Sequence, residues 1–148
     1  IFRFYNIHPA TNNSSFQFQG STDSGSSYGV SITSSFFQAY HAEDGSATSL
    51  SYNTNNDLGN STSFQIIADT TGNGDDESAS GFLHLFSPSD TTFVKNFIAI
   101  DNHSYNGAYS INDFSGGYFN TTSAINAIQF KMSSGNIDSG TIKLYGVS

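Results

Sequence analysis

The sequence predicts an all-β protein, namely an antiparallel β-sandwich of jelly-roll type with about eight or nine strands. The chain has 148 residues, of which 15% are aromatic (14 Phe and 8 Tyr) and only 11% are charged. Aromatic residues favour strands, and the Ser, Thr, Asn and Gly residues between them favour turns. Short segments alternate apolar and polar residues, whereas no segment carries the apolar stripe of a helix. A chain of this length fits one domain, residues 1–148.

Nine segments show the alternation that is typical of strands, and turn residues separate them. So many short strands fit two packed sheets better than a small closed barrel. The polar stretch 41–61 has two interpretations, a wide surface loop or a weak strand flanked by loops. In chain order the nine segments are 2–7, 14–20, 28–40, 62–69, 81–87, 91–101, 105–114, 124–133 and 141–146.

The alternation also predicts which side chains face the core, because successive residues of a strand point to opposite faces. Phe16 and Phe18 share one face of segment 14–20, and glutamines occupy the other face. Near the end of the chain, Ile142 and Leu144 alternate with polar residues. We expect these two side chains to close the core.

Glycines and lysines add two further expectations for the strands. Residues 133–148, SSGNIDSGTIKLYGVS, combine glycine-containing turns with an alternating segment, so we expect a hairpin and its return strand. Lys95, Lys131 and Lys143 each alternate with apolar neighbours. We expect all three on solvent faces, where lysine also discourages pairing between sheet edges.

The charge balance excludes one class of partner. The formal net charge is −8, so the chain repels a phosphate backbone and nucleic-acid binding is not expected. A surface rich in hydroxyl and amide groups instead suits uncharged polar partners, of which sugars are the obvious class. The cations are Arg3, Lys95, Lys131 and Lys143.

Other features of the composition concern the setting of the chain. The sequence has no cysteine and no apolar run approaching the roughly 20 residues that span a bilayer, so we expect neither disulfides nor membrane insertion. Residue 1 is Ile rather than Met, and the first segment already has the pattern of a strand. We therefore expect this chain to be the C-terminal part of a longer protein.

The strongest acidic cluster is the segment DTTGNGDDE, which lies between two predicted strands. Closely spaced carboxylates and amides on a flexible turn are the oxygen ligands that Ca²⁺ prefers. The spacing does not match an EF-hand loop, however, and the same residues are common in solvated turns. Both interpretations stay open, and no other cofactor is expected. The candidate ligands are Asp69, Asn73, Asp75, Asp76 and Glu77.

Catalytic signatures are missing from the sequence. The histidines His8, His41, His84 and His103 are scattered, with neither an HxH pair nor an HExxH motif. There is no GxSxG elbow, and the acids lie almost wholly in predicted turns. We therefore expect a protein that is not an enzyme.

Aromatic residues are interleaved with Asn, Gly and Ser in the segment 102–120. Tyrosines exposed beside amides form a platform for a sugar ring or a partner protein, although aromatic residues at this density also pack strands together. Both interpretations remain open. The candidate ligand-binding residues are Asn102, Tyr105, Tyr109, Tyr118 and Phe119.

The C-terminal segment resembles a module that closes many structural proteins of tailed phages. The resemblance extends upstream, since QGSTDSGSSYG at 19–29 is similar to a hairpin of that module, and SGFLHLFSPSDTT is similar to its central strand and turn. The middle of the chain, residues 36–62, departs from the pattern. The matching C-terminal residues are Ala124, Ile125, Asn126, Ile128, Phe130, Ser133, Ser134, Gly135, Asn136, Ile137, Ser139, Gly140, Thr141, Ile142, Leu144, Tyr145 and Gly146.

This resemblance implies a β-sandwich on the surface of a virion, in a tail, fibre or other appendage. The expected role is assembly with other virion proteins and attachment to glycans of the host surface. Phage appendages are commonly symmetric oligomers, so a homotrimer is expected. Two alternatives remain, a capsid decoration protein and a carbohydrate-binding module of a secreted enzyme.

Overall fold

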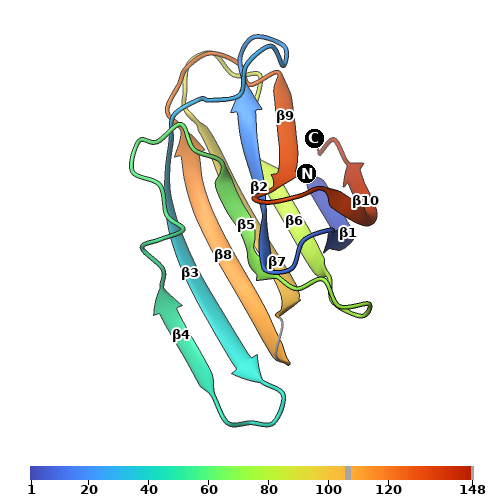
Figure 1. The fold of residues 1–148 in the computed structure, drawn as a ribbon. Helices are drawn as coiled ribbons and strands as arrows, with labels where there is room; N and C mark the ends of the chain where they lie inside the picture. The colour runs from blue at the N-terminus through green and yellow to red at the C-terminus, as the bar shows by residue number, and fades with distance from the viewer. Residues whose placement is uncertain (106–107, 148) are drawn as a thin grey trace.

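The structure is a computed structural model that describes residues 1–105 and 108–147. It confirms the predicted fold class, because ten strands form two antiparallel sheets that pack as a sandwich (Figure 1). None of the described residues forms a helix long and apolar enough to span a membrane. The strands are β1 (Phe2–Pro9), β2 (Ser14–Ser21), β3 (Ile32–Ala42), β4 (Thr48–Tyr52), β5 (Gln65–Thr71), β6 (Ala79–Leu85), β7 (Lys95–Tyr105), β8 (Tyr109–Phe119), β9 (Ala127–Met132) and β10 (Ile137–Leu144).

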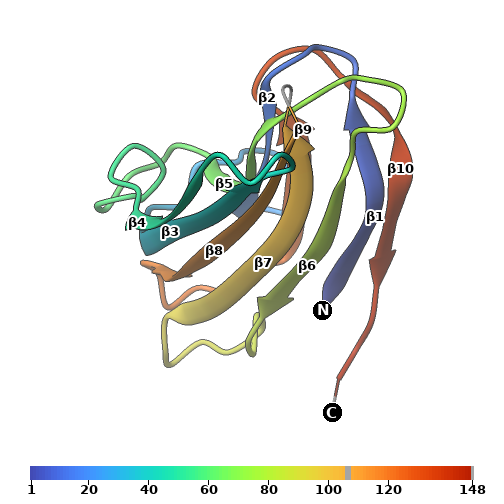
Figure 2. The same ribbon diagram turned by 90° about the horizontal axis from the view of Figure 1, so that it is seen from below.

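The two sheets differ in size. The larger sheet has seven strands in the order β10-β1-β6-β7-β8-β3-β4, and the smaller sheet has three in the order β5-β2-β9. The strands β2, β5 and β9 belong to the smaller sheet, and the strand that follows each of them in the chain belongs to the larger sheet (Figures 1 and 2). Three strands do not cover seven, so the larger sheet extends beyond the smaller one on both sides.

Phenylalanines fill the space between the sheets. Phe16 and Phe18 of β2 are 1% and 0% exposed, which confirms the face predicted for them. The Phe18 ring meets the ring of Phe97 edge-on, with centroids 5.1 Å apart, and Phe16 meets Phe4 in the same way at 5.0 Å. Burying one such side chain contributes about 1.5–3 kcal/mol, so this cluster is the main source of stability.

The polar stretch 41–61 contains a short strand, β4, which agrees with the second of its two interpretations. β4 pairs with β3 at the edge of the larger sheet, where Leu50 lies opposite Ala39 and Tyr52 opposite Phe37. Four of its five residues are exposed. This exposure explains the weak pattern, because a strand that buries neither face has little reason to alternate. Each of the other nine strands overlaps one predicted segment.

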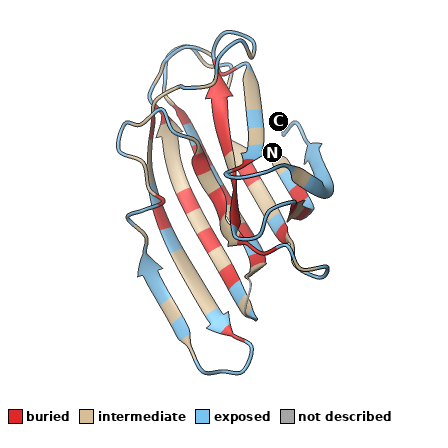
Figure 3. Ribbon diagram, in the orientation of Figure 1, coloured by how far each residue is buried: buried red, intermediate tan, exposed pale blue. Residues whose placement is uncertain are grey.

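The hairpin predicted for residues 133–148 is wrong, because β9 belongs to the smaller sheet and β10 pairs with β1 in the larger one. Ile142 and Leu144 do not close the core either. They are 38% and 68% exposed because β10 is an edge strand beyond the smaller sheet (Figure 3). Gly140 has a φ of +124° at an irregularity of the β1–β10 pairing, where a Cβ atom would lie 2.7 Å from the carbonyl oxygen of Asn6.

Residues 19–29, which resemble a phage hairpin in sequence, also connect two sheets rather than two paired strands. β2 pairs with β5 and β9, whereas β3 pairs with β4 and β8. Asp23 organises this connection. Its carboxylate accepts hydrogen bonds from the hydroxyls of Ser21 and Ser27, both at 2.6 Å, and from the Ser27 N–H at 2.9 Å.

The solvent-facing position predicted for Lys95 is wrong, because its side chain is fully buried. Lys95 occupies the same face of β7 as Phe97, and this face points toward the smaller sheet. Its ammonium group donates hydrogen bonds to the carbonyl oxygens of Phe93, Thr121 and Thr122. Carbonyl groups that converge from two loops therefore compensate for the burial of the charge. Lys131 and Lys143 are exposed, as predicted.

Candidate functional site

The five predicted calcium ligands are spread over a strand and the loop that follows it. Asp69 lies in β5 at the sandwich interior, whereas the other four candidates follow in the β5–β6 loop. Glu77 turns back onto its own loop and accepts a hydrogen bond of 2.7 Å from the Gly74 N–H. Across residues 1–105 and 108–147, no three carboxylates of this loop bring ligand atoms within 4.8 Å of one another.

The five predicted ligand-binding residues are distributed over three places. Asn102 and Tyr118 lie on the outer face of the larger sheet. Tyr105 and Tyr109 lie at the far end of the β7–β8 pair, where their ring centroids are 6.1 Å apart. Phe119 is 0% exposed and packs against the Phe18 ring, so it is a core residue that a surface ligand does not reach.

A continuous row of mainly aromatic and aliphatic side chains crosses the outer face of the larger sheet. Residues directly opposite each other in antiparallel strands share a face, so the pairing register identifies the row. The rings of Phe37 and Phe114 are stacked within it, with centroids 5.0 Å apart and planes inclined by 6°. Phe37 is 41% exposed and Tyr52 is 53% exposed. In order, the aromatic row consists of Tyr52, Phe37, Phe114, Ile100, Phe82, Arg3 and Lys143.

A second row, which consists of small or polar side chains apart from Leu50 at its end, runs beside the aromatic row. Its centre is the pair Asn102 and Asn112, and the side-chain amide of Asn102 donates a hydrogen bond of 3.2 Å to the Asn112 side-chain oxygen. Asn112 in turn donates to the backbone oxygen of Asp101, which fixes its orientation. The amide row consists of Leu50, Ala39, Asn112, Asn102 and Ser80.

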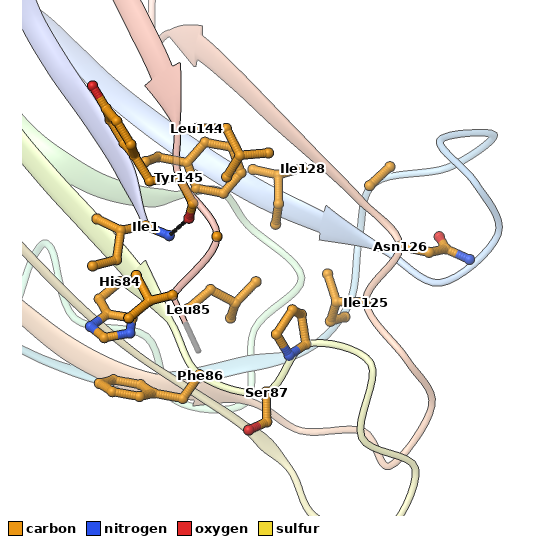
Figure 4. A pocket seen from close by; sticks show the side chains of 15 residues that line it. Ile1, His84, Leu85, Phe86, Ser87, Ile125, Asn126, Ile128, Leu144 and Tyr145 are labelled. Carbon is orange, nitrogen blue, oxygen red and sulfur yellow. Dashed lines mark hydrogen bonds between the residues drawn. The ribbon is translucent and has the colours of Figure 1, made fainter.

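An apolar cleft of about 810 Å³ opens where the two sheets separate near the chain ends (Figure 4). The ammonium group of Ile1 donates a hydrogen bond of 2.7 Å to the Tyr145 backbone oxygen and so closes one wall. His84 and Phe86 follow on the neighbouring strand β6 and just beyond it, and their rings are stacked with centroids 3.9 Å apart. The remaining lining residues are Phe2, Leu85, Ser87, Pro88, Ile125, Asn126, Ala127, Ile128, Leu144, Gly146 and Val147.

The sandwich interior also contains a cluster of ionisable groups. Asp101 on β7 lies directly opposite Asp113 on β8, and His103 is two residues further along β7 on the same face. All three side chains are at most 3% exposed. The Nδ1 atom of His103 lies 3.0 Å from Oδ2 of Asp101. The Asp113 carboxylate accepts hydrogen bonds from Nε2 of Gln38 at 2.9 Å and from the Asp69 N–H at 2.7 Å.

Burial controls the ionisation of this cluster. It raises the pKa of Asp101 to about 6, although the hydrogen bond and charge of His103 act in the opposite direction. Burial and then the charge of Asp101 raise the pKa of Asp113 to about 7. Burial alone would lower the pKa of His103, but the hydrogen bond and charge of Asp101 raise it overall.

Two signals in the sequence point to the residues that the predictions missed. Phe36 and Phe37 are adjacent in one strand, so only one of them faces the core, and the other has to lie on the outer face. Asp101 and His103 are two residues apart in one strand and so share a face. The alignment of Asp101 with Asp113 has no comparable signal, because it depends on the register between β7 and β8.

The outer face is therefore suited to binding, and the interior cluster to holding an ion or a hydrogen-bonded network. No protein family, curated protein or solved structure matches this chain. The function is accordingly inferred from the residues of the two sites and from the sequence resemblance.

Proposed function

We propose that this chain is a non-enzymatic attachment domain on the surface of a phage virion and that it binds neutral glycans of the host surface. The binding surface is the outer face of the larger sheet, formed by the aromatic row and the amide row. The observation that carries this proposal is the aromatic row, whose side chains are aromatic or aliphatic on the five strands from β4 to β6. Exposed apolar patches on soluble proteins mark interaction sites.

The chemistry of the two rows favours a sugar chain. Sugar rings present C–H faces that pack on aromatic side chains, and their hydroxyl groups exchange hydrogen bonds with amides. The stacked rings of Phe37 and Phe114 lie directly beside the amides of Asn112 and Asn102. Strands are about 4.8 Å apart, so neighbouring side chains of a row contact successive parts of an extended chain.

The charge of the surface favours a neutral ligand over an anionic one. Neither row contains an acidic residue, and the only cations of the aromatic row are Arg3 and Lys143 at its β1–β10 end. Both are engaged with tyrosine rings, since Arg3 lies 5.9 Å from the Tyr145 centroid and Lys143 lies 5.4 Å from the Tyr5 centroid. With a net charge of −8, the protein as a whole repels sulfated or phosphorylated polymers.

The phage setting rests on the C-terminal sequence pattern, and the all-β sandwich is compatible with it. Assembly as a homotrimer belongs to the same proposal, because several weak glycan contacts on one particle add through multivalency. The molar mass of the purified protein, measured by light scattering, tests the trimer directly.

The binding test uses the purified protein with a panel of neutral and anionic polysaccharides and with intact host cells. We expect binding to neutral polymers, and we expect the double variant Phe37→Ala, Phe114→Ala to lose at least about tenfold in affinity because it removes two ring contacts. Phe93→Ala is the matched control, since Phe93 is 71% exposed but lies in the β6–β7 loop. Circular dichroism of each variant verifies the fold.

The outcomes separate the proposed function from its alternatives. Equal binding by the double variant and the control would contradict the outer-face site. Antibody labelling of whole particles locates the domain, and labelling of heads rather than appendages would favour a decoration protein. Glycan binding with no association with particles would favour a carbohydrate-binding module.

A further inference from the structure

The Asp101, His103 and Asp113 cluster has the composition and spacing of a metal site. One ligand atom from each residue can be chosen so that all three lie within 4.8 Å of one another. Nδ1 of His103 and Oδ2 of Asp101 are 3.0 Å apart, which is hydrogen-bond distance, so an ion that uses this pair of atoms replaces their hydrogen bond.

Two polar atoms of the cluster lack a hydrogen-bond partner. Oδ1 of Asp101 and Nε2 of His103 are buried, and neither makes a hydrogen bond within the described part of the chain. Their residues are 3% and 2% exposed. A buried polar atom without a partner costs about 1–3 kcal/mol, so the cluster as it stands leaves buried polar groups unsatisfied.

The charges facing the cluster also favour a cation. The carboxylates of Asp101 and Asp113 face each other across the β7–β8 pair, and Asp69 contributes a third negative charge from β5. Lys95 is at the other end of β7, where three carbonyl groups hold its ammonium. A divalent cation would balance two buried carboxylates without requiring either to bind a proton.

We propose that Asp101, His103 and Asp113 bind a divalent transition-metal ion, with Zn²⁺ as the preferred ion, between β7, β8 and β5 of the sandwich. An imidazole nitrogen with two carboxylates suits Zn²⁺ and its neighbours, whereas Ca²⁺ takes oxygen ligands alone. Gln38 and the Asp69 N–H hold the Asp113 carboxylate in place, as outer partners of a metal ligand do. The role is structural, because the ion ties adjacent strands together inside the fold.

The test measures metal bound to the whole chain. The protein is unfolded in urea with EDTA, freed of chelator and refolded with Zn²⁺, Mn²⁺ or Ca²⁺, since a buried site loads as the chain folds. After desalting, we expect about one Zn²⁺ per chain by mass spectrometry and no retained Ca²⁺. Tm should rise by roughly 5–10 °C when free Zn²⁺ is about 100 times Kd.

Variants assign the ion to the cluster. Asp101→Asn and His103→Gln should each reduce retained Zn²⁺ at least tenfold and abolish the Zn²⁺-dependent rise in Tm. The matched controls are Asp138→Asn on the exposed edge strand and His84→Gln in the cleft wall, and both should bind as the wild type does. Retention of Ca²⁺ that depends on Asp75 and Asp76 would place the metal in the β5–β6 loop and overturn the proposal.

A measurement on the wild-type protein tests the metal site without relying on variants, which can fail to fold. Paramagnetic Mn²⁺ broadens the NMR signals of nearby nuclei, so it should broaden resonances around 101–103 and 113 while leaving those of β10 sharp. Absence of retained Zn²⁺ after refolding, or broadening confined to exposed acids, would refute the metal site. The outcome is independent of glycan binding, because the two sites lie on opposite faces of β7 and β8.

Discussion

The sandwich interior has two halves in which buried side chains are stabilised in different ways. In the phenylalanine half, rings such as Phe16, Phe18 and Phe97 meet edge-on and exclude water. In the acidic half, Asp101 and Asp113 are just as buried but depend on specific partners. The same face of β7 supplies both halves, since Phe97 and Asp101 point the same way four residues apart.

This difference shows that strand pairing, rather than residue polarity, decides what is buried here. An apolar side chain is stabilised by any well-packed neighbour, so the phenylalanine half tolerates approximate contacts. A carboxylate requires a donor at the correct distance, so the acidic half is stable only with its own partners in place. The two halves should therefore respond differently to substitution.

The largest effect is expected in the phenylalanine half. Phe18→Ala removes a ring that is 0% exposed and contacts both Phe97 and Phe119. We expect the free energy of unfolding, measured with urea, to fall by about 3–5 kcal/mol because a cavity replaces the ring. Phe93→Ala, which changes a side chain that is 71% exposed, should shift it by no more than about 0.5 kcal/mol. Similar losses in the two variants would contradict the assigned core.

The acidic half should show a smaller and more specific loss. Asp113→Ala leaves Nε2 of Gln38 and the Asp69 N–H without their acceptor. We expect the free energy of unfolding, measured in EDTA, to fall by about 2 kcal/mol. The loss of two hydrogen bonds outweighs the gain from no longer burying a carboxyl group. Asp113→Asn keeps one side-chain oxygen and should lose about half as much. A stabilised Asp113→Ala variant would show that burial of the acid outweighs its hydrogen bonds.

Much of the phenylalanine half could be predicted from the sequence, whereas the acidic half could not. Alternation placed Phe16 and Phe18 correctly because the pattern is local to one strand. Lys95 and Asp101 were missed because polarity suggests a solvent face, and only the position of the smaller sheet shows which face of β7 is covered. The aromatic row depends on the register of seven strands, which no single segment encodes.

The boundary of the phenylalanine half can be tested with two leucines. Leu144 lies on the inward-pointing side of β10 but is 68% exposed, whereas Leu83 on β6 is 0% exposed. Leu144→Ala should change the free energy of unfolding by no more than about 0.5 kcal/mol, while Leu83→Ala serves as the buried counterpart with an expected loss of about 2–5 kcal/mol. A large loss for Leu144→Ala would mean that β10 is covered in solution, for instance by another copy of the chain.

The smallest effect concerns Asp23, an exposed acid whose pKa is shifted in the opposite direction from the pKa values of the buried acids. Hydrogen bonds from the hydroxyls of Ser21 and Ser27 lower the pKa of Asp23 to about 2, whereas burial raises that of Asp113 to about 7. Because the folded pKa of Asp23 is below its ordinary value of 3.8, its charged form stabilises the fold above pH 3.8, and that contribution is lost as pH falls toward 2.

An NMR titration of the carboxyl carbons should therefore show Asp23 titrating near pH 2, well below its ordinary value of 3.8. Asp23→Asn cannot ionise, so between pH 4 and 2 its stability should fall less steeply than that of the wild type. Parallel stability curves, or an Asp23 pKa near 3.8, would show that the serine hydrogen bonds do not persist in solution.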